Sequence, residues 1–183
     1  QINLRVTGLK NTIHKISAEI NSLERLGLTT MSKVVLLAAD NAASKACANE
    51  LKKNIEQIFG LAKQNIEIKR IKGLQVHDVK SLKEQGFREL VTTILAYLTD
   101  DNLNYQYDLI LNPTGGYKGV IPFVTVLGML YGKRSVYIFE HAEQLINLPP
   151  LPFSFDIDIY NRVVPALKRI DEQTAIAEQE YYA

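Results

Sequence analysis

The sequence contains a single cysteine, Cys47. One cysteine forms no disulfide framework within the chain and supplies no metal-ligand spacing, which favours a reducing compartment. Long apolar runs are also missing: none approaches the roughly 20 residues that cross a bilayer, and no signal peptide is visible. Because the chain begins with Gln1 rather than Met, we expect a membrane anchor only in a segment outside it. The expected location is the cytoplasm, as a free protein or as the cytosolic part of a membrane-anchored one.

A surplus of charge of either sign is missing as well. The 183 residues include 21 Lys and Arg against 20 Asp and Glu, a net charge of +1. Binding to nucleic acids in general requires a clearly basic face, so we do not expect it here. A polyanion would have to be held by a small local cluster of charge. The hydrophobic content of 46% is sufficient for one globular domain with a full core.

Two kinds of hydrophobic periodicity alternate along the chain. Short apolar runs predict buried strands at residues 34–39, 66–71, 108–112 and 135–140. Apolar side chains at helical spacing predict helices around residues 13–23, 48–59, 87–98 and 120–131. Strict alternation of this kind predicts an α/β fold with a Rossmann-like, mostly parallel sheet covered by helices on both faces.

The helix predicted at residues 120–131 is apolar on nearly all sides. A helix of this composition is buried, so we expect it to lie in the core or against a second subunit. Pro122 is compatible with the helix because it falls in the first turn.

The two ends differ in character from the rest of the chain. Residues 2–7 alternate apolar and polar side chains, which suits an edge strand or a half-exposed strand. Residues 147–156 contain three prolines and predict a rigid connector. After it we expect a short C-terminal helical element, with a break at Pro165 and a last helix capped by Thr174.

A loop with adjacent glycines follows the predicted strand 108–112. It reads Asn-Pro-Thr-Gly-Gly-Tyr-Lys-Gly, residues 112–119, and leads into a predicted helix. In a parallel α/β sheet, ligands bind at the carboxyl ends of the strands, in loops of this kind. Gly115 and Gly116 permit positive φ angles and let a ligand approach the backbone closely. Their N–H groups, with the N-terminus of the following helix, can bind an anion.

The other side chains of this loop suit a nucleotide. Lys118 supplies a positive charge and Thr114 a hydroxyl group. Asn112 can bind a base edge or a ribose, and Tyr117 offers a face for stacking. Together these residues predict a ligand that carries phosphate. The alternative is a tight turn with Lys118 in solvent.

Two common phosphate-binding signatures are absent. The spacing is not G-x-x-x-x-G-K-[ST], which disfavours a Walker-type NTPase, and it is not G-x-G-x-x-G, which disfavours the usual dinucleotide fingerprint. The three histidines, His14, His77 and His141, are far apart and have no partner at metal-binding spacing. No metal site is therefore expected.

A second candidate loop follows the first strongly apolar strand. Asp40, Asn41 and Ser44 stand between that strand and the next helix, so they should lie at the same edge of the sheet as the glycine loop. An ordinary helix N-cap is the alternative for these residues. Glu140 ends another predicted strand at this edge, where it can accept a ribose hydroxyl or face solvent.

The motifs together resemble a known family. The order is "ISAEINSL", "VVLLAADNAASKACANELKK", "LNPTGGYKG", "VLGMLYG", "VYIFE" and "LPPLP". In this order they resemble the CARF family, the CRISPR-associated Rossmann-fold sensor domains, and most closely the branch whose loop reads Asn-x-Thr-Gly-Gly-Phe/Tyr-Lys. The likeness implies a ligand-sensing domain at residues 1–156 and a C-terminal helical extension at residues 157–183.

The resemblance implies a homodimer, or a higher oligomer, that binds a cyclic oligoadenylate across its two-fold axis. The expected ring is cyclic tetra-adenylate, a second messenger of type III CRISPR antiviral defence, and no other cofactor is implied. Binding would control an effector outside this chain. The ligand residues that the resemblance assigns are Asn112, Thr114, Gly115, Gly116, Tyr117, Lys118, Asp40 and Asn41. In a symmetric dimer the same small cluster of residues would contact the ligand twice, so the chain needs no large net charge to bind it.

Two alternatives to a non-catalytic sensor stay open. Some CARF proteins cleave the ring, and Lys118 would then be the catalytic residue. The family's first strand usually ends in a Gly-Thr-Ser-like turn, whereas residues 6–12 read "VTGLKNT", so efficient cleavage is not expected. The second alternative, a nucleotide-cofactor enzyme on a Rossmann-like scaffold, lacks both the dinucleotide fingerprint and an acid–base constellation.

Overall fold

The computed structural model describes residues 17–75, 77–139, 144–149, 159, 162–166 and 168–170. The strand expected at residues 2–7, the ligand residue Glu140 and the cap expected at Thr174 lie outside this part. The chain divides into two compact units, Gln1–Pro150 and Leu151–Ala183. In the second unit, residues 162–166 and 168–170 are helical, so Pro165 lies inside a helical stretch rather than at the break expected there.

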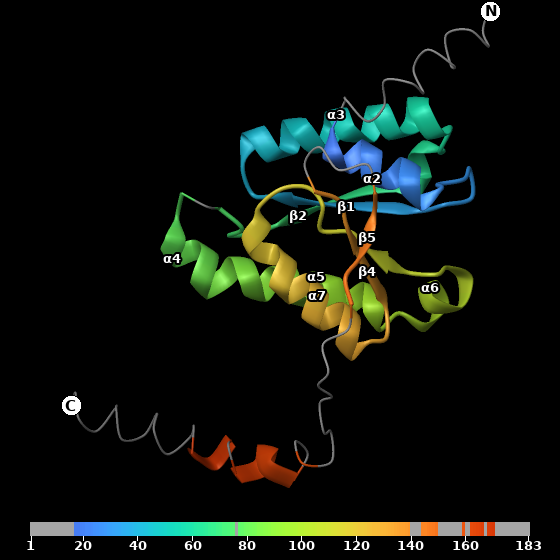
Figure 1. Ribbon diagram of the computed structural model, residues 1–183. Helices are drawn as coiled ribbons and strands as arrows, with labels where there is room; N and C mark the ends of the chain where they lie inside the picture. Colours follow the sequence, from blue (N-terminus) through green and yellow to red (C-terminus); the bar gives the residue numbers. More distant parts are fainter. Residues whose placement is uncertain are drawn as a thin grey trace, which may run out of the picture. The chain divides into compact units, whose positions relative to one another are not determined.

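The first unit is an α/β structure (Figure 1). Its helices are α2 (Ala18–Leu26), α3 (Ala42–Phe59), α4 (Val79–Ser81), α5 (Phe87–Leu98), α6 (Asp101–Gln106) and α7 (Ile121–Leu130). Its strands are β1 (Val34–Ala39), β2 (Ile66–Ile71), β3 (Ile110–Leu111), β4 (Arg134–Tyr137) and β5 (Ile146–Asn147). Strand and helix alternate through most of the unit, which confirms the α/β class.

Local signals set the helix boundaries. The hydroxyl of Ser17 accepts a hydrogen bond of 3.2 Å from the N–H of Ile20, and this cap begins α2. The side chain of Asn41 accepts a hydrogen bond of 2.8 Å from the N–H of Ser44, so α3 begins well before the residue 48 that periodicity indicated. A glycine with a left-handed backbone ends each of these helices. The polar caps therefore set the starts of both helices, which the apolar stripe alone does not mark.

The strands form two small sheets in the described part of the chain. β1 and β2 are parallel, in register from Val34 opposite Ile66 to Ala39 opposite Ile71. β3 and β4 are also parallel, and β5 joins the far side of β4 in the antiparallel direction. We expected one Rossmann-like sheet. Parallel pairing is confirmed, but β1 and β3 are not paired with each other, so a single continuous sheet is not seen among these residues.

Helices cover both faces of the strands. Figure 1 shows α2 and α3 on one side of β1 and β2, and α5 and α7 on the other. Each side has its own apolar cluster. The residues of the first cluster are Ile20, Val34, Ile55, Leu61 and Ile66. The residues of the second are Ile71, Leu74, Leu82, Leu90, Ile94, Leu98, Val124 and Leu127.

Helix α7 is buried on one side only. Val124 and Leu127 join the second apolar cluster, and the ring of Phe123 stacks on Phe87 with centroids 4.5 Å apart. Phe123 itself is nevertheless 37% exposed, as is Val126, and Leu130 is 48% exposed. Within this chain, burial in the core therefore accounts for one side of the helix, and burial of the other side against a second subunit stays a prediction. Pro122 lies at the start of the helix, as predicted.

Candidate functional site

The glycine loop connects β3 to α7 through a short 3₁₀ turn at Lys118–Val120. Its two adjacent glycines are required for different reasons. Gly116 has a φ angle of +82°, in the left-handed region that side chains rarely adopt. Gly115 is approached by Glu19 of α2, whose side chain fills the space that a Cβ would occupy. The expected positive φ is thus found at Gly116, and the close approach at Gly115 is to another part of the chain.

Asn112 and Thr114 form a hydrogen-bond network that fixes this loop. The Nδ2 atom of Asn112 donates to the Ser22 hydroxyl at 2.7 Å, and its Oδ1 accepts from the Thr114 hydroxyl at 2.6 Å. The Thr114 hydroxyl also accepts from the N–H of Ile138, just beyond β4, at 3.2 Å. The Ser22 hydroxyl in turn donates to the carbonyl of Glu19 at 2.7 Å. In this structure both side chains tie the loop to α2 and to the end of β4.

Tyr117 and Lys118 lie at the surface of the loop. The Tyr117 side chain is 40% exposed, and its ring lies against Gly119, where a Cβ would collide with it. Lys118 is exposed and begins the 3₁₀ turn that leads into α7. An exposed aromatic ring and an ammonium group beside a glycine with positive φ form a local surface that suits a base and a phosphate.

The second loop is built around the N-cap of α3. Asn41 makes the capping hydrogen bond to Ser44, so the N-cap alternative describes its role in this structure. The Asp40 carboxylate forms an ion pair of 3.1 Å with Arg70, at the end of β2. The Asp40 carbonyl accepts a hydrogen bond of 2.7 Å from Gln75. The two Asp40 contacts join the ends of β1 and β2. Both residues of this loop that the resemblance assigns to ligand, Asp40 and Asn41, thus make contacts within the chain.

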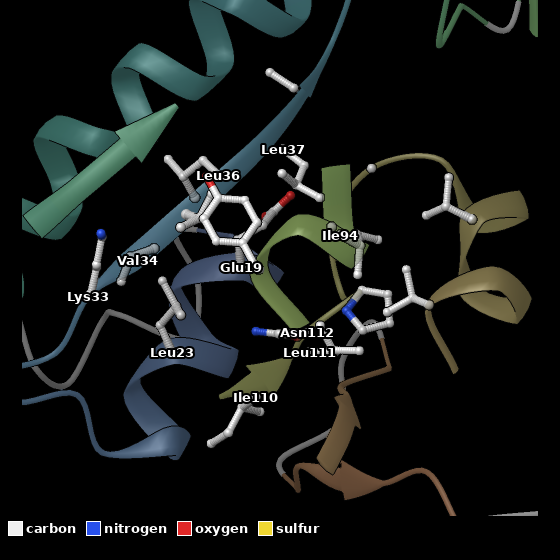
Figure 2. A pocket seen from close by; sticks show the side chains of 18 of the residues that line it. Glu19, Leu23, Lys33, Val34, Leu36, Leu37, Ile94, Ile110, Leu111 and Asn112 are labelled. Carbon is white, nitrogen blue, oxygen red and sulfur yellow. The ribbon is translucent and has the colours of Figure 1, made fainter. Parts of the chain in front are cut away.

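A cavity of about 900 Å³ brings the two loops together. Six of the expected site residues line it: Asn41, Ser44, Asn112, Gly115, Gly116 and Tyr117. Asp40, Thr114 and Lys118 are not among its lining residues. Much of the remaining wall is apolar, with Leu36, Ile94 and Leu111 on separate elements around it (Figure 2). A highly charged ligand fits the polar loops and does not fit this apolar interior.

Two residues of α2 belong to the site, although the sequence patterns did not assign them. Glu19 projects toward Gly115, and Figure 2 labels it among the residues of the cavity. Ser22 is fully buried and supports Asn112. A weak signal was present in the sequence: polar Asn21 and Ser22 stand between apolar Ile20 and Leu23 on this helix. Periodicity alone does not say which distant residue such a group contacts.

One pair of titratable side chains interacts strongly away from the loops. The Tyr97 hydroxyl on α5 donates a hydrogen bond of 3.0 Å to Glu67 on β2. Burial and this hydrogen bond raise the pKa of Tyr97. Burial acts to raise the pKa of Glu67, but hydrogen bonds from Lys69 and Tyr97 outweigh it, and the pKa is lowered.

Among the described residues no group of His, Cys, Asp and Glu side chains could hold a metal ion.

The fold and the site define an α/β protein with polar loops after two of its parallel strands. Residues 14–151 match the family model Cas_APE2256, described as a CRISPR-associated protein. The match covers well over half of the chain, so the protein belongs to this family of CRISPR-associated proteins and thereby to CRISPR antiviral defence. A comparison with curated proteins found no match.

In the described part of the chain, no helix has the length and apolar character needed to cross a membrane.

Proposed function

We propose that this chain is a CARF-type sensor domain that binds a cyclic oligoadenylate, with cyclic tetra-adenylate as the expected ring, and controls an effector outside residues 1–183. The observation that carries the proposal is the glycine loop after β3. It combines a positive φ at Gly116 with the exposed side chains of Tyr117 and Lys118. Membership of a CRISPR-associated family supports this ligand class over an ordinary nucleotide cofactor.

The binding chemistry follows from the loop. The ammonium group of Lys118 can form a charge-assisted hydrogen bond with a phosphate, and the backbone beside Gly116 can approach it without a side chain in the way. Tyr117 can stack on an adenine base. Asn112 and Thr114 contribute by holding the loop in place, since their polar atoms bond to Ser22, to each other and to Ile138.

A symmetric ligand fits a symmetric dimer. The α7 side chains of Phe123, Val126 and Leu130 leave an apolar surface next to the glycine loop. We propose that this surface, the α7 face, pairs with the same surface of a second copy. Two glycine loops then meet one ring, and each Lys118 serves one half of it. This arrangement binds a tetra-anion with a chain of net charge +1.

Calorimetry with cyclic tri-, tetra- and hexa-adenylate tests the proposal. We expect heat with cyclic tetra-adenylate and loss of binding in Lys118→Ala. Lys53→Ala is the matched control, because it removes an equal charge from an exposed position of α3 and should bind normally. Absence of heat with all three rings contradicts the proposal. Chromatography of the recovered ligand then shows whether the ring is intact, and a linear product with a 2′,3′-cyclic phosphate would identify a ring nuclease instead.

A further inference from the structure

The carboxylate of Glu19 lies against the glycine loop. Its side chain fills the space that a Cβ at Gly115 would need, and it lines the cavity together with Asn112 (Figure 2). The side chain is half-buried. Among the residues that the structure describes, this carboxylate has no hydrogen bond and no ion pair. Both of its oxygens therefore keep their capacity to accept hydrogen bonds from a ligand.

The place of Glu19 in the first turn of α2 does not by itself explain this contact. An acidic side chain there stabilises the helix through its dipole, but it does so equally well when it points into solvent. The contact with Gly115 leaves room only for a glycine in the loop. A negative charge at this position also repels the phosphate groups that the loop is proposed to bind. The contact is therefore unfavourable for binding unless the carboxylate meets a hydrogen-bond donor of the ligand.

Other polar side chains around the cavity are already engaged or lie elsewhere. The Asn112 amide, which the sequence offered for a base edge, donates to Ser22 and accepts from Thr114. The side-chain oxygen of Asn41 caps α3. Asp108 also lines the cavity, but it precedes β3, so it lies at the opposite end of that strand from the glycine loop. Glu19 is thus the carboxylate that the described residues offer to a ligand at this loop.

We propose that Glu19 recognises the base of the ligand by accepting a hydrogen bond from the N6 amino group of adenine, an inference that rests on the proposed function. An ionised carboxylate only accepts hydrogen bonds. A cyclic oligoadenylate donates them from its amino groups and its ribose 2′-hydroxyls, whereas its phosphates only accept. Tyr117 lines the same cavity as Glu19, so a base that stacks on the Tyr117 ring presents its edge to neighbouring side chains.

This role divides the recognition of one nucleotide among three side chains. Lys118 binds the phosphate, Tyr117 the face of the base and Glu19 its edge. A base in which hydrogen replaces the amino group would leave the Glu19 carboxylate facing a C–H group. Loss of one hydrogen bond to a charged group corresponds to about a 10- to 100-fold decrease in affinity. Glu19 therefore selects a base that carries an amino group at this edge.

Calorimetry with two rings tests the role of Glu19. The rings are cyclic tetra-adenylate and the cyclic tetramer of purine ribonucleotide, which lacks the amino groups. We expect the protein to prefer the adenine ring by about 10- to 100-fold. Glu19→Gln, which keeps a neutral acceptor, should retain a smaller preference, and Glu19→Ala should show none. Glu50→Gln, at an exposed position of α3, is the matched control and should keep the full preference.

The ratio of the two affinities separates recognition from a structural role. Loss of the contact with Gly115 changes the affinity for both rings alike, so it cancels in this ratio. Equal binding of both rings by the unmodified protein, or a preference that survives in Glu19→Ala, overturns the inference and leaves the sensor function standing. A Glu19→Ala variant that loses only its preference for ribose over the deoxyribose ring assigns the carboxylate to the 2′-hydroxyl instead. Absence of binding to either ring contradicts the sensor function, and the role of Glu19 falls with it.

Discussion

The Nδ2 atom of Asn112 donates a hydrogen bond of 2.7 Å to the hydroxyl of Ser22, a residue 90 positions earlier in the chain. The bond joins the first residue of the glycine loop to the middle of α2. Ser22 has no exposed surface, so water does not reach it to take its place as the hydrogen-bond partner of Asn112. The position of the loop that we assign to ligand therefore depends on α2.

Replacing Ser22 by Ala should destabilise the protein and weaken ligand binding together. The change leaves the Asn112 amide without its partner in a partly buried site, which costs about 1–3 kcal/mol. Urea denaturation measures the loss. Ser32→Ala is the control, because the Ser32 hydroxyl accepts a hydrogen bond in an exposed turn and its removal should cost less. Equal losses for both variants would argue against the network.

The two glycines should respond differently to alanine. At Gly115 a methyl group collides with the Glu19 side chain, and overpacking of this kind costs about 1–3 kcal/mol. At Gly116 the cost, again about 1–3 kcal/mol, comes from the left-handed backbone. Adding Glu19→Ala should therefore restore the stability of Gly115→Ala and leave that of Gly116→Ala unchanged. A double-mutant cycle measures this difference, and equal behaviour of the two glycines would contradict it.

Stability should fall at alkaline pH because of Tyr97. Burial and the hydrogen bond to Glu67 raise the pKa of Tyr97 in the folded state, so its proton is lost first from the unfolded chain. The stabilisation is complete below the ordinary tyrosine pKa of about 10 and decreases as the pH rises above it. Tyr97→Phe should reduce the dependence of stability on pH. Denaturation between about pH 8 and 11, where tyrosine ionises, measures it. Tyr105→Phe, at a residue 93% exposed, should leave it unchanged.

Glu67 should contribute at the acid end of the pH scale. Hydrogen bonds from Lys69 and Tyr97 outweigh the effect of burial and lower its pKa. The ionised form of Glu67 is therefore more favourable in the folded state than in the unfolded chain. Its contribution is present above the ordinary pKa of 4.5 and is lost as the pH falls through the lower folded value. Glu67→Gln should flatten the acid side of the stability profile. An unchanged acid profile in this variant would show that the pair carries no such coupling.

A charge on the α7 face should separate the proposed dimer. Leu130→Glu replaces a leucine that is 48% exposed in the single chain by a charged residue. The fold should therefore persist while association is lost. Val79→Glu introduces the same change at another exposed apolar residue, on α4, and should leave the association state unchanged. Sedimentation velocity distinguishes the two. A dimer that survives Leu130→Glu would exclude the α7 face as its interface.

Much of the local structure could be predicted from the sequence. The runs 34–39 and 66–71 are strands at those residues. The first is apolar throughout, and the second places Ile66, Ile68 and Ile71 among charged side chains. The strand predicted at residues 108–112 is shorter, Ile110–Leu111, and among the described residues it pairs with β4. The apolar stripe marks α3 only from residue 48, but the polar residues Asp40, Asn41 and Ser44 indicated its start, and Asn41 is the N-cap in the structure.

The sequence by itself determined the alternation of strands and helices, the α/β class and a glycine loop between a strand and a helix, because these depend on periodicity and on neighbouring residues. Only the tertiary structure decided why each glycine is required. A Cβ at Gly115 would collide with Glu19, and Gly116 has a left-handed backbone. It also decided that Asn112 is held by Ser22, and that a cavity separates β1 from β3. These relationships join residues that are far apart in the chain. Local patterns carry no information about such contacts, since each depends on how whole elements pack.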